Sequence, residues 1–264
     1  MNARRLAWNL APAVVVAAGL AIWEIWVRAA GVPAWLLPPP SKIAETLWTQ
    51  RRTLAHHAWV TLGEVLAGFG AALVVGVLLA VVIDASRIAS RAIYPLVIAS
   101  QTIPVIALAP LLLTWFGYGL TPKVIVIGVI VFFPIVVNTV DGLAGADREQ
   151  LDLLRSFGAG RWRRFWIVKA PGAAPMIFSG ARIGVAVSVI GAVFAEFSGS
   201  RAGLGYLIRI SNSQQRTALV FAAITVLSAM ALALFGAVTA LERTCLPWRR
   251  IVTEPDDAKP ERRH

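Results

Sequence analysis

Six long apolar runs, separated by shorter polar segments, divide the chain. Each run approaches the ~20 residues that a helix needs to cross a bilayer. Inside a bilayer such a run must be helical, because a helix satisfies its own backbone N–H and C=O groups. The pattern therefore predicts an all-α polytopic membrane protein with six transmembrane helices, at Trp8–Val27, Leu62–Ile83, Ile93–Phe116, Pro122–Val140, Ile177–Phe197 and Thr217–Leu241.

The third of these runs is irregular because it contains three prolines, Pro95, Pro104 and Pro110. Proline lacks the backbone N–H that a helix uses, and its ring clashes with the preceding turn. We therefore expect this helix to kink or break.

The segment between the first two runs is amphipathic. Three prolines precede Ser41, which favours a helix start. Leu47, Trp48, Leu54 and Trp59 then give the segment an apolar side. This pattern is typical of a helix that rests at the outer membrane interface.

The chain is expected to form one transmembrane domain over residues 1–264. Within it, we expect an N-terminal anchor helix with the external amphipathic segment over 1–60, and a core over 61–245. The charged, proline-containing stretch 249–264 is predicted to be a disordered cytoplasmic tail.

Composition supports a membrane location. Of the 264 residues 58% are hydrophobic, and the mean hydropathy is +0.71. A soluble domain of this length has no core large enough to bury so many apolar side chains. The net charge is +11, but the Lys and Arg residues cluster at the ends of the apolar runs. This distribution argues against nucleic-acid binding. Lys and Arg residues are in excess on the side of the membrane that holds the two termini, which predicts that both termini are cytoplasmic.

Several kinds of catalytic chemistry are absent from the sequence. It has no G-x-x-x-x-G-K-[ST] phosphate loop, no H-E-x-x-H and no C-x-x-C. His56 and His57 are adjacent, so they point to different faces of a helix, and we expect no metal site and no cofactor. The chain is not expected to be an enzyme.

Ionisable residues are rare in the middle of the predicted spans. A proton-driven carrier usually has such groups at mid-membrane. Their scarcity favours a transporter whose energy comes from elsewhere, although a stand-alone secondary carrier and a membrane enzyme stay open as alternatives.

The basic segment LDLLRSFGAGRWRRFWIVKAPGAAP, residues 151–175, lies between the fourth and fifth spans and is predicted to be cytoplasmic. Leu151, Leu154 and Phe157 recur at helical spacing, and Gly158 allows a sharp turn. A second short helix is expected to follow and to stop at Pro171. The alternative is an ordinary positively charged loop.

This segment resembles the cytoplasmic motif E-A-A-x3-G-x9-I-x-L-P of ABC importer permeases. The glycine and the proline match in position, while Asp replaces Glu, Leu-Leu replaces Ala-Ala, Val replaces Ile and Ala replaces the last Leu. The aligned positions are Asp152, Leu153, Leu154, Gly158, Val168, Ala170 and Pro171.

Other segments resemble the branch of these permeases that serves nitrate, sulfonate, taurine and thiamine-precursor importers. They include LLPPPSKIAETLW, ASQTIPVIALAPLLLTWFGYG, FFPIVVNTVDGL and SGARIGVAVSVIGAVFAEF. The resemblance covers about residues 35–248.

The resemblance implies a bacterial inner-membrane permease that pairs with a second copy of itself and has no ATPase activity of its own. It implies docking on a cytoplasmic ABC ATPase subunit, and delivery of substrate by a periplasmic or lipid-anchored binding protein. It further implies that SGSRAGLGYLIRISNSQQRTA helps to form the outer face. The residues that the resemblance assigns to ATPase coupling are Leu151, Asp152, Leu154, Arg155, Phe157, Gly158, Ala159, Arg161, Arg163 and Pro171.

A substrate path between two copies would be lined by polar groups of the inner spans. The candidates are Gln101, Thr102, Asn138, Asp141, Ser188 and Glu196, although such groups also bond helix carbonyls without touching substrate. Gly68, Gly76, Gly184 and Gly191 are predicted to allow close helix packing. By resemblance the substrate is a pyrimidine precursor of thiamine, with sulfonate, taurine or nitrate as alternatives.

Overall fold

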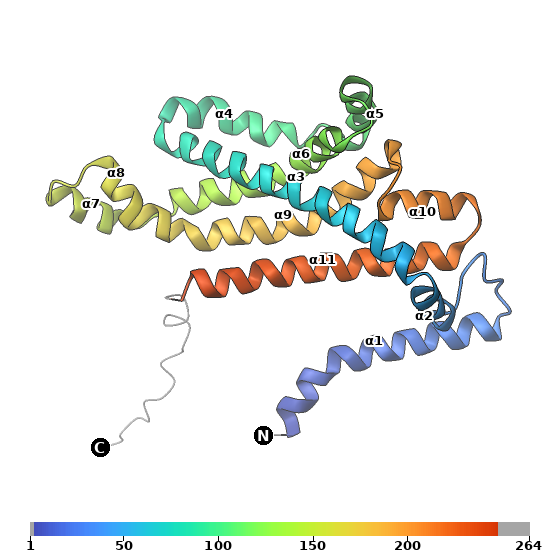
Figure 1. Ribbon diagram of the computed structural model, residues 1–264. Helices are drawn as coiled ribbons and strands as arrows, with labels where there is room; N and C mark the ends of the chain where they lie inside the picture. The colour runs from blue at the N-terminus through green and yellow to red at the C-terminus, as the bar shows by residue number, and fades with distance from the viewer. Residues whose placement is uncertain (1–2, 248–264) are drawn as a thin grey trace, which may run out of the picture. The chain divides into compact units, whose positions relative to one another are not determined.

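The computed structural model describes residues 3–247, and the regular elements within that range are helical (Figure 1). The predicted disordered tail at 249–264 lies outside the described residues. The elements, in chain order, are α1 (Ala3–Ala29), α2 (Pro40–Thr49), α3 (Arg51–Ala85), α4 (Arg87–Ser100), α5 (Val105–Phe116), α6 (Leu120–Ala144), α7 (Arg148–Ser156), α8 (Arg161–Arg164), the π-helix η1 (Phe165–Lys169), α9 (Ala170–Gly199), α10 (Leu204–Ser213) and α11 (Thr217–Cys245).

Four helical stretches of the described chain are long and apolar enough to cross a membrane. They are Arg51–Ala85, Leu120–Ala144, Arg161–Gly199 and Thr217–Cys245, and they contain the second, fourth, fifth and sixth predicted spans. The first predicted span falls within α1, and its role as a span stays a prediction.

The break expected in the third apolar run is confirmed. The helix breaks after Ser100 and resumes at Val105, so the run forms α4 and α5, neither of them as long as a span. Pro104 stands directly before α5, and Pro95 and Pro110 lie inside the two helices. The break occurs where proline cannot supply the N–H that would continue the helix.

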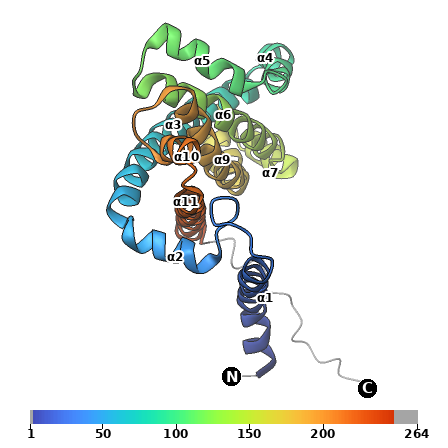
Figure 2. The ribbon, with the colours of Figure 1, turned by 90° about the vertical axis from the view of Figure 1, so that its right-hand side faces the viewer.

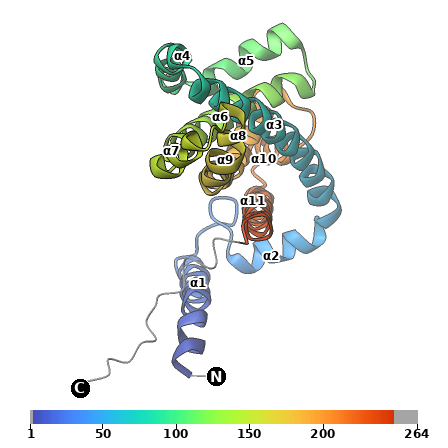
Figure 3. The ribbon, with the colours of Figure 1, turned by 90° about the vertical axis from the view of Figure 1, so that its left-hand side faces the viewer.

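The chain divides into two compact units. Of the described residues, the first unit gathers those up to Glu64 with Ala109–Lys123 and Ala192–Met230, and the second gathers Val65–Leu108, Val124–Gly191 and those from Ala231. In the first unit, α10 lies beside the beginning of α3 (Figure 2). In the second unit, α6 and α9 run side by side with α7 near their end (Figure 3).

Close packing of three helices in the second unit depends on glycine. A Cβ atom on Gly68 of α3 would lie 2.6 Å from Ile127 Cβ of α6, and one on Gly184 of α9 would lie 3.1 Å from Val131. Gly76 and Gly191 make similar approaches to α6. The prediction that these four glycines serve close helix packing is confirmed.

Candidate functional site

The segment Asp147–Lys169, here called the α7–α8 loop, is built as two short helices around a turn. Asp147 caps α7, since its Oδ1 accepts from Glu149 N at 2.9 Å and from Gln150 N at 3.5 Å. Glu149 in the first turn and Arg155 in the last turn also suit the helix dipole. A nine-residue helix is thereby stabilised at its N-terminus by side chains that follow one another in sequence.

The turn after α7 has the hydrogen bonds of a Schellman motif. Gly158 N donates to Arg155 O at 2.9 Å, and Ala159 N donates to Leu154 O at 2.9 Å. Gly158 adopts φ +73°, a conformation that costs an L-residue roughly 1–2 kcal/mol. The predicted sharp turn at this glycine is confirmed, and its geometry fixes where α8 begins.

The prediction that Pro171 stops the second helix is wrong. Helical structure continues from α8 through η1 into α9, with Pro171 in the first turn of α9. Ala170 N donates to Phe165 O, one residue farther back than in an α-helix. The wider π-turn stands directly before the proline and gives its ring room, so that the chain continues. The α7–α8 loop is therefore continuous with a long helix.

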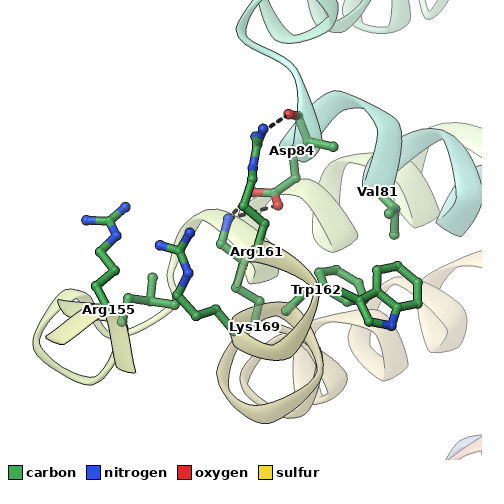
Figure 4. A pocket seen from close by; sticks show the side chains of 10 residues that line it. Val81, Asp84, Arg155, Arg161, Trp162 and Lys169 are labelled. Atoms are coloured by element: carbon green, nitrogen blue, oxygen red, sulfur yellow. Dashed lines mark hydrogen bonds and ion pairs between the residues drawn. The ribbon is translucent and has the colours of Figure 1, made fainter. Parts of the chain in front are cut away.

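Two polar contacts tie the α7–α8 loop to the end of α3. Lys169 Nζ lies 2.7 Å from Asp84 Oδ1 and 2.8 Å from Oδ2, and Arg161 Nη2 donates to Ala85 O at 3.0 Å. Figure 4 shows Arg161 and Lys169 both reaching the chain at Asp84. The side chains of Lys169 and Asp84 are only 26% and 15% exposed, so this pair is screened less than an ion pair on the surface.

The α7–α8 loop presents an apolar edge to its surroundings. Phe157 is 78% exposed and Leu153 is 58% exposed. The other two residues that were predicted to share this face with Phe157 are Leu151 and Leu154, and both are half-buried. The exposed leucine is Leu153, one helical turn before Phe157, and the spacing i, i+4 is the signal that would have found it.

The remaining residues of the predicted coupling set lie at the surface or close to it. Arg155 pairs with Asp152 at 2.6 Å, and both side chains are exposed, which makes the pair energetically weak. Arg163 and Pro171 are exposed, while Ala159 is half-buried.

The residues predicted to line a substrate path differ in their environments. Gln101 and Thr102 are exposed in the connection between α4 and α5, and Asp141 is exposed on α6. Asn138 is half-buried, and its Nδ2 donates to Pro134 O at 2.7 Å within α6. This contact is the alternative that the sequence left open for Asn138, a hydrogen bond to a helix carbonyl.

Ser188 and Glu196 are fully buried. Ser188 Oγ donates to Val185 O at 2.7 Å. Glu196 Oε1 accepts from Thr61 Oγ1 at 2.7 Å, and its Oε2 accepts from the backbone N–H groups of Gly205 and Tyr206. Neither side chain presents an atom to a path in this structure.

Glu196 belongs to a polar network that satisfies the N-terminus of α10. The N–H of Gly203 donates to His57 Nδ1 at 3.0 Å, and that of Leu204 donates to Thr61 Oγ1 at 2.8 Å. With the two bonds to Glu196, the first four N–H groups of this helix end are all paired. A helix end buried in an apolar protein needs such partners.

A second network in the same unit holds a buried lysine. Lys123 Nζ lies 2.5 Å from Glu64 Oε1 and 2.6 Å from Ser200 Oγ. The lysine and glutamate side chains are 12% and 5% exposed. Charges this far from water are retained only when paired, so the pair fixes α6 to α3 and to the connection that leads into α10.

The fold and these sites define the class: a polytopic, helical membrane protein. The chain belongs to the family of binding-protein-dependent transport system inner membrane components, whose sequence profile matches residues 72–245. It is accordingly the permease component of an ABC importer, a transport protein and not an enzyme, in the inner membrane.

Relatives cover nearly the whole chain. It is 40% identical over 232 residues to the formylaminopyrimidine transport permease protein ThiX of Halalkalibacterium halodurans, covering 88% of this chain and 92% of the relative. It is 38% identical to the riboflavin transport system permease protein RibX of Chloroflexus aurantiacus, covering 87% and 86%. The taurine transport system permease protein TauC of Escherichia coli is 28% identical, with 94% and 95% covered.

Solved structures share the fold. An inward-facing MetNI methionine ABC transporter matches with a TM-score of 0.64 at 19% identity, over 76% of this chain and 97% of that chain. An amino acid ABC transporter with histidines matches with a TM-score of 0.60 at 16% identity, over 78% and 97%.

Gly203→Ala should destabilise the protein by about 1–3 kcal/mol. Gly203 has φ +115°, and a Cβ there would lie 2.2 Å from Glu196 Cδ, so the capping carboxylate would have to move. Gly119→Ala is the control, since a Cβ at Gly119 has no neighbour within 4 Å. Thermal unfolding of the purified proteins measures the difference, and equal stability of the two variants would contradict the capping role.

Proposed function

We propose that the α7–α8 loop is the coupling element of this permease, through which a cytoplasmic ATPase subunit moves the membrane helices. Phe157 and Leu153 offer an exposed apolar edge that suits a cleft on a partner. The opposite side of the loop is tied to α3 by Lys169 and Asp84. That ion pair carries the proposal, because a push on the exposed edge passes through it directly into a long helix.

The continuity of η1 with α9 supports the same proposal. A loop that ended at Pro171 would hinge freely, whereas a loop continuous with α9 turns that helix with it. Closure of an ATPase dimer is then converted into rotation of α3 and α9 by a rigid-body step.

The proposal includes the partners and the orientation expected from the sequence. The α7–α8 loop and both termini lie in the cytoplasm, a binding protein docks on the opposite face, and two copies of this chain pair in the lipid bilayer. Residues 61–245 form the permease core, and residues 1–60 supply an anchor helix and the external segment that contains α2.

The substrate path is proposed to run along the polar groups that the second unit leaves accessible. These are Gln101 and Thr102 at the break between α4 and α5, and Asp141 on α6, with Asn138 one helical turn before Asp141. Ser188 and Glu196 are assigned to helix packing and capping, because both are fully buried.

Gly158→Val is expected to leave the permease folded and inserted but to lower ATP-driven uptake roughly tenfold, since valine resists φ +73° by about 1–2 kcal/mol. Gly160→Val is the matched control. Gly160 has φ −66° and no neighbour within 4 Å of a Cβ, so this variant should transport normally. Uptake is measured in vesicles that contain the ATPase subunit and the loaded binding protein. Normal uptake by the Gly158 variant would remove the turn from the mechanism.

We further propose that the transported solute contains a pyrimidine ring. The two relatives at 40% and 38% identity are named for formylaminopyrimidine and riboflavin. Both compounds contain a pyrimidine ring with hydrogen-bonding groups on its edge. The taurine relative is more distant, at 28% identity, so the sulfonate branch is the second candidate.

ATP-driven uptake of formylaminopyrimidine should exceed uptake of taurine at least tenfold, because a path and a binding protein built for a ring's hydrogen bonds reject a solute that lacks them. The measurement uses vesicles with the ATPase subunit and the cognate binding protein, with radiolabelled formylaminopyrimidine, riboflavin and taurine compared at equal concentration. Preferential uptake of taurine would contradict the pyrimidine assignment while leaving the coupling proposal intact.

A further inference from the structure

A cavity of about 340 Å³ lies between the end of α3 and the α7–α8 loop (Figure 4). Val81 and Asp84 of α3 form one wall, and residues of α7, α8 and η1 form the others. The cavity is large enough for a phosphate group with part of the molecule that carries it. Its use is not explained by the coupling of the α7–α8 loop to an ATPase.

The charge of this cavity is strongly positive. Its lining, among the residues that the structure describes, has four basic side chains and a single acidic one, Asp84; the basic ones are Arg155, Arg161, Arg164 and Lys169. Lys169 neutralises Asp84 at 2.7 Å. Three guanidinium groups are left, and among the described residues only Arg155 has an acidic partner, at the exposed surface.

The arginines are placed to bind an anion. Arg161 is fixed in position by its bond from Nη2 to Ala85 O at 3.0 Å, and its planar group carries further N–H donors. Arg164 Nε is buried and donates to no atom of the described chain. Arg164 is also a lining residue of the cavity, so its guanidinium charge adds to the positive potential there.

An aromatic cluster beside the cavity contains Trp162, Phe165 and Trp166. The Trp162 and Phe165 rings stack with centroids 6.1 Å apart, and Trp162 contacts Trp166 edge-on at 5.6 Å. Both tryptophans are exposed, at 72% and 56%. Exposed tryptophan next to arginine at the end of a membrane helix is typical of the headgroup level of a bilayer.

We propose that this cavity binds a phosphate group, carried by an anionic phospholipid of the neighbouring leaflet or by a free phosphate compound. Arginine forks match phosphate oxygens in geometry and charge, and the site has no excess of acid that would repel them. The proposal depends only on the cavity and its arginines, and it stands whether or not the α7–α8 loop couples to an ATPase.

Two binding measurements on the purified full-length chain distinguish the sources of phosphate. In the first, native mass spectrometry compares retention of phosphatidylglycerol with retention of phosphatidylcholine. In the second, calorimetry titrates sodium phosphate into the protein, with sodium chloride as the reference. Preference for phosphatidylglycerol without phosphate binding identifies a lipid headgroup, and phosphate binding above the chloride reference identifies a free phosphate compound.

Arg164→Gln and Arg161→Gln should each weaken the observed binding about tenfold, because each removes a charged donor from the cavity. Arg155→Gln, at an exposed position whose loss does not threaten folding, should weaken it in the same direction. Arg91→Gln is the matched control, since Arg91 is an exposed arginine of α4 outside the cavity. The proposal is overturned if neither measurement detects binding. It is also overturned if Arg91→Gln weakens binding as much as the cavity variants do, because the ligand would then be attracted by the net positive charge of the protein and not by the cavity.

Discussion

The ion pair between Lys169 and Asp84 joins two parts of the chain that are 85 residues apart in sequence. Asp84 is the next-to-last residue of α3, and Lys169 closes the π-helix that leads into α9. Without this contact only the bond from Arg161 to Ala85 O would tie the α7–α8 loop to α3. With it, the position of the loop determines the position of two long helices. The adjacent bond from Arg161 to Ala85 O holds the loop to the end of α3 at a second point.

The N-terminus of α10, in the other unit, also depends on polar contacts with other helices. In an apolar protein, helix ends must find partners for backbone groups that the helix itself leaves unpaired. Gly203 has no side chain with which to cap α10, and so Glu196, Thr61 and His57 supply acceptors from other helices. A carboxylate that appears available for substrate in the sequence is therefore used to hold a connection in place.

Local features were predictable from the sequence, and contacts between distant residues were not. The helix of the α7–α8 loop follows from the spacing of its leucines, and the turn follows from Gly158. The close approaches of Gly68 and Gly184 follow from the preference for small residues between membrane helices. Pairing of Asp84 with Lys169, and the capping of α10 by Glu196, depend on tertiary packing that a periodic pattern does not contain.

One prediction about proline failed and another was confirmed, because the effect of a proline depends on its position. Pro171 was expected to end a helix, but the helix continues through it, because a preceding π-turn gives its ring room. Pro104 has the opposite effect, because the apolar run that contains it must break. An apolar run of spanning length thus becomes two shorter helices, as its prolines predict, although its hydropathy alone does not reveal the division.

The central claim is that motion of the α7–α8 loop reaches α3 through one ion pair, and a charge exchange tests it most directly. ATP-driven uptake is measured for Asp84→Lys, for Lys169→Asp and for the two changes combined, with binding of the ATPase subunit followed in parallel. The account predicts that each single change abolishes most uptake while the ATPase still binds, and that the combined change restores it. Full uptake by either single variant, or no recovery in the double variant, would contradict it.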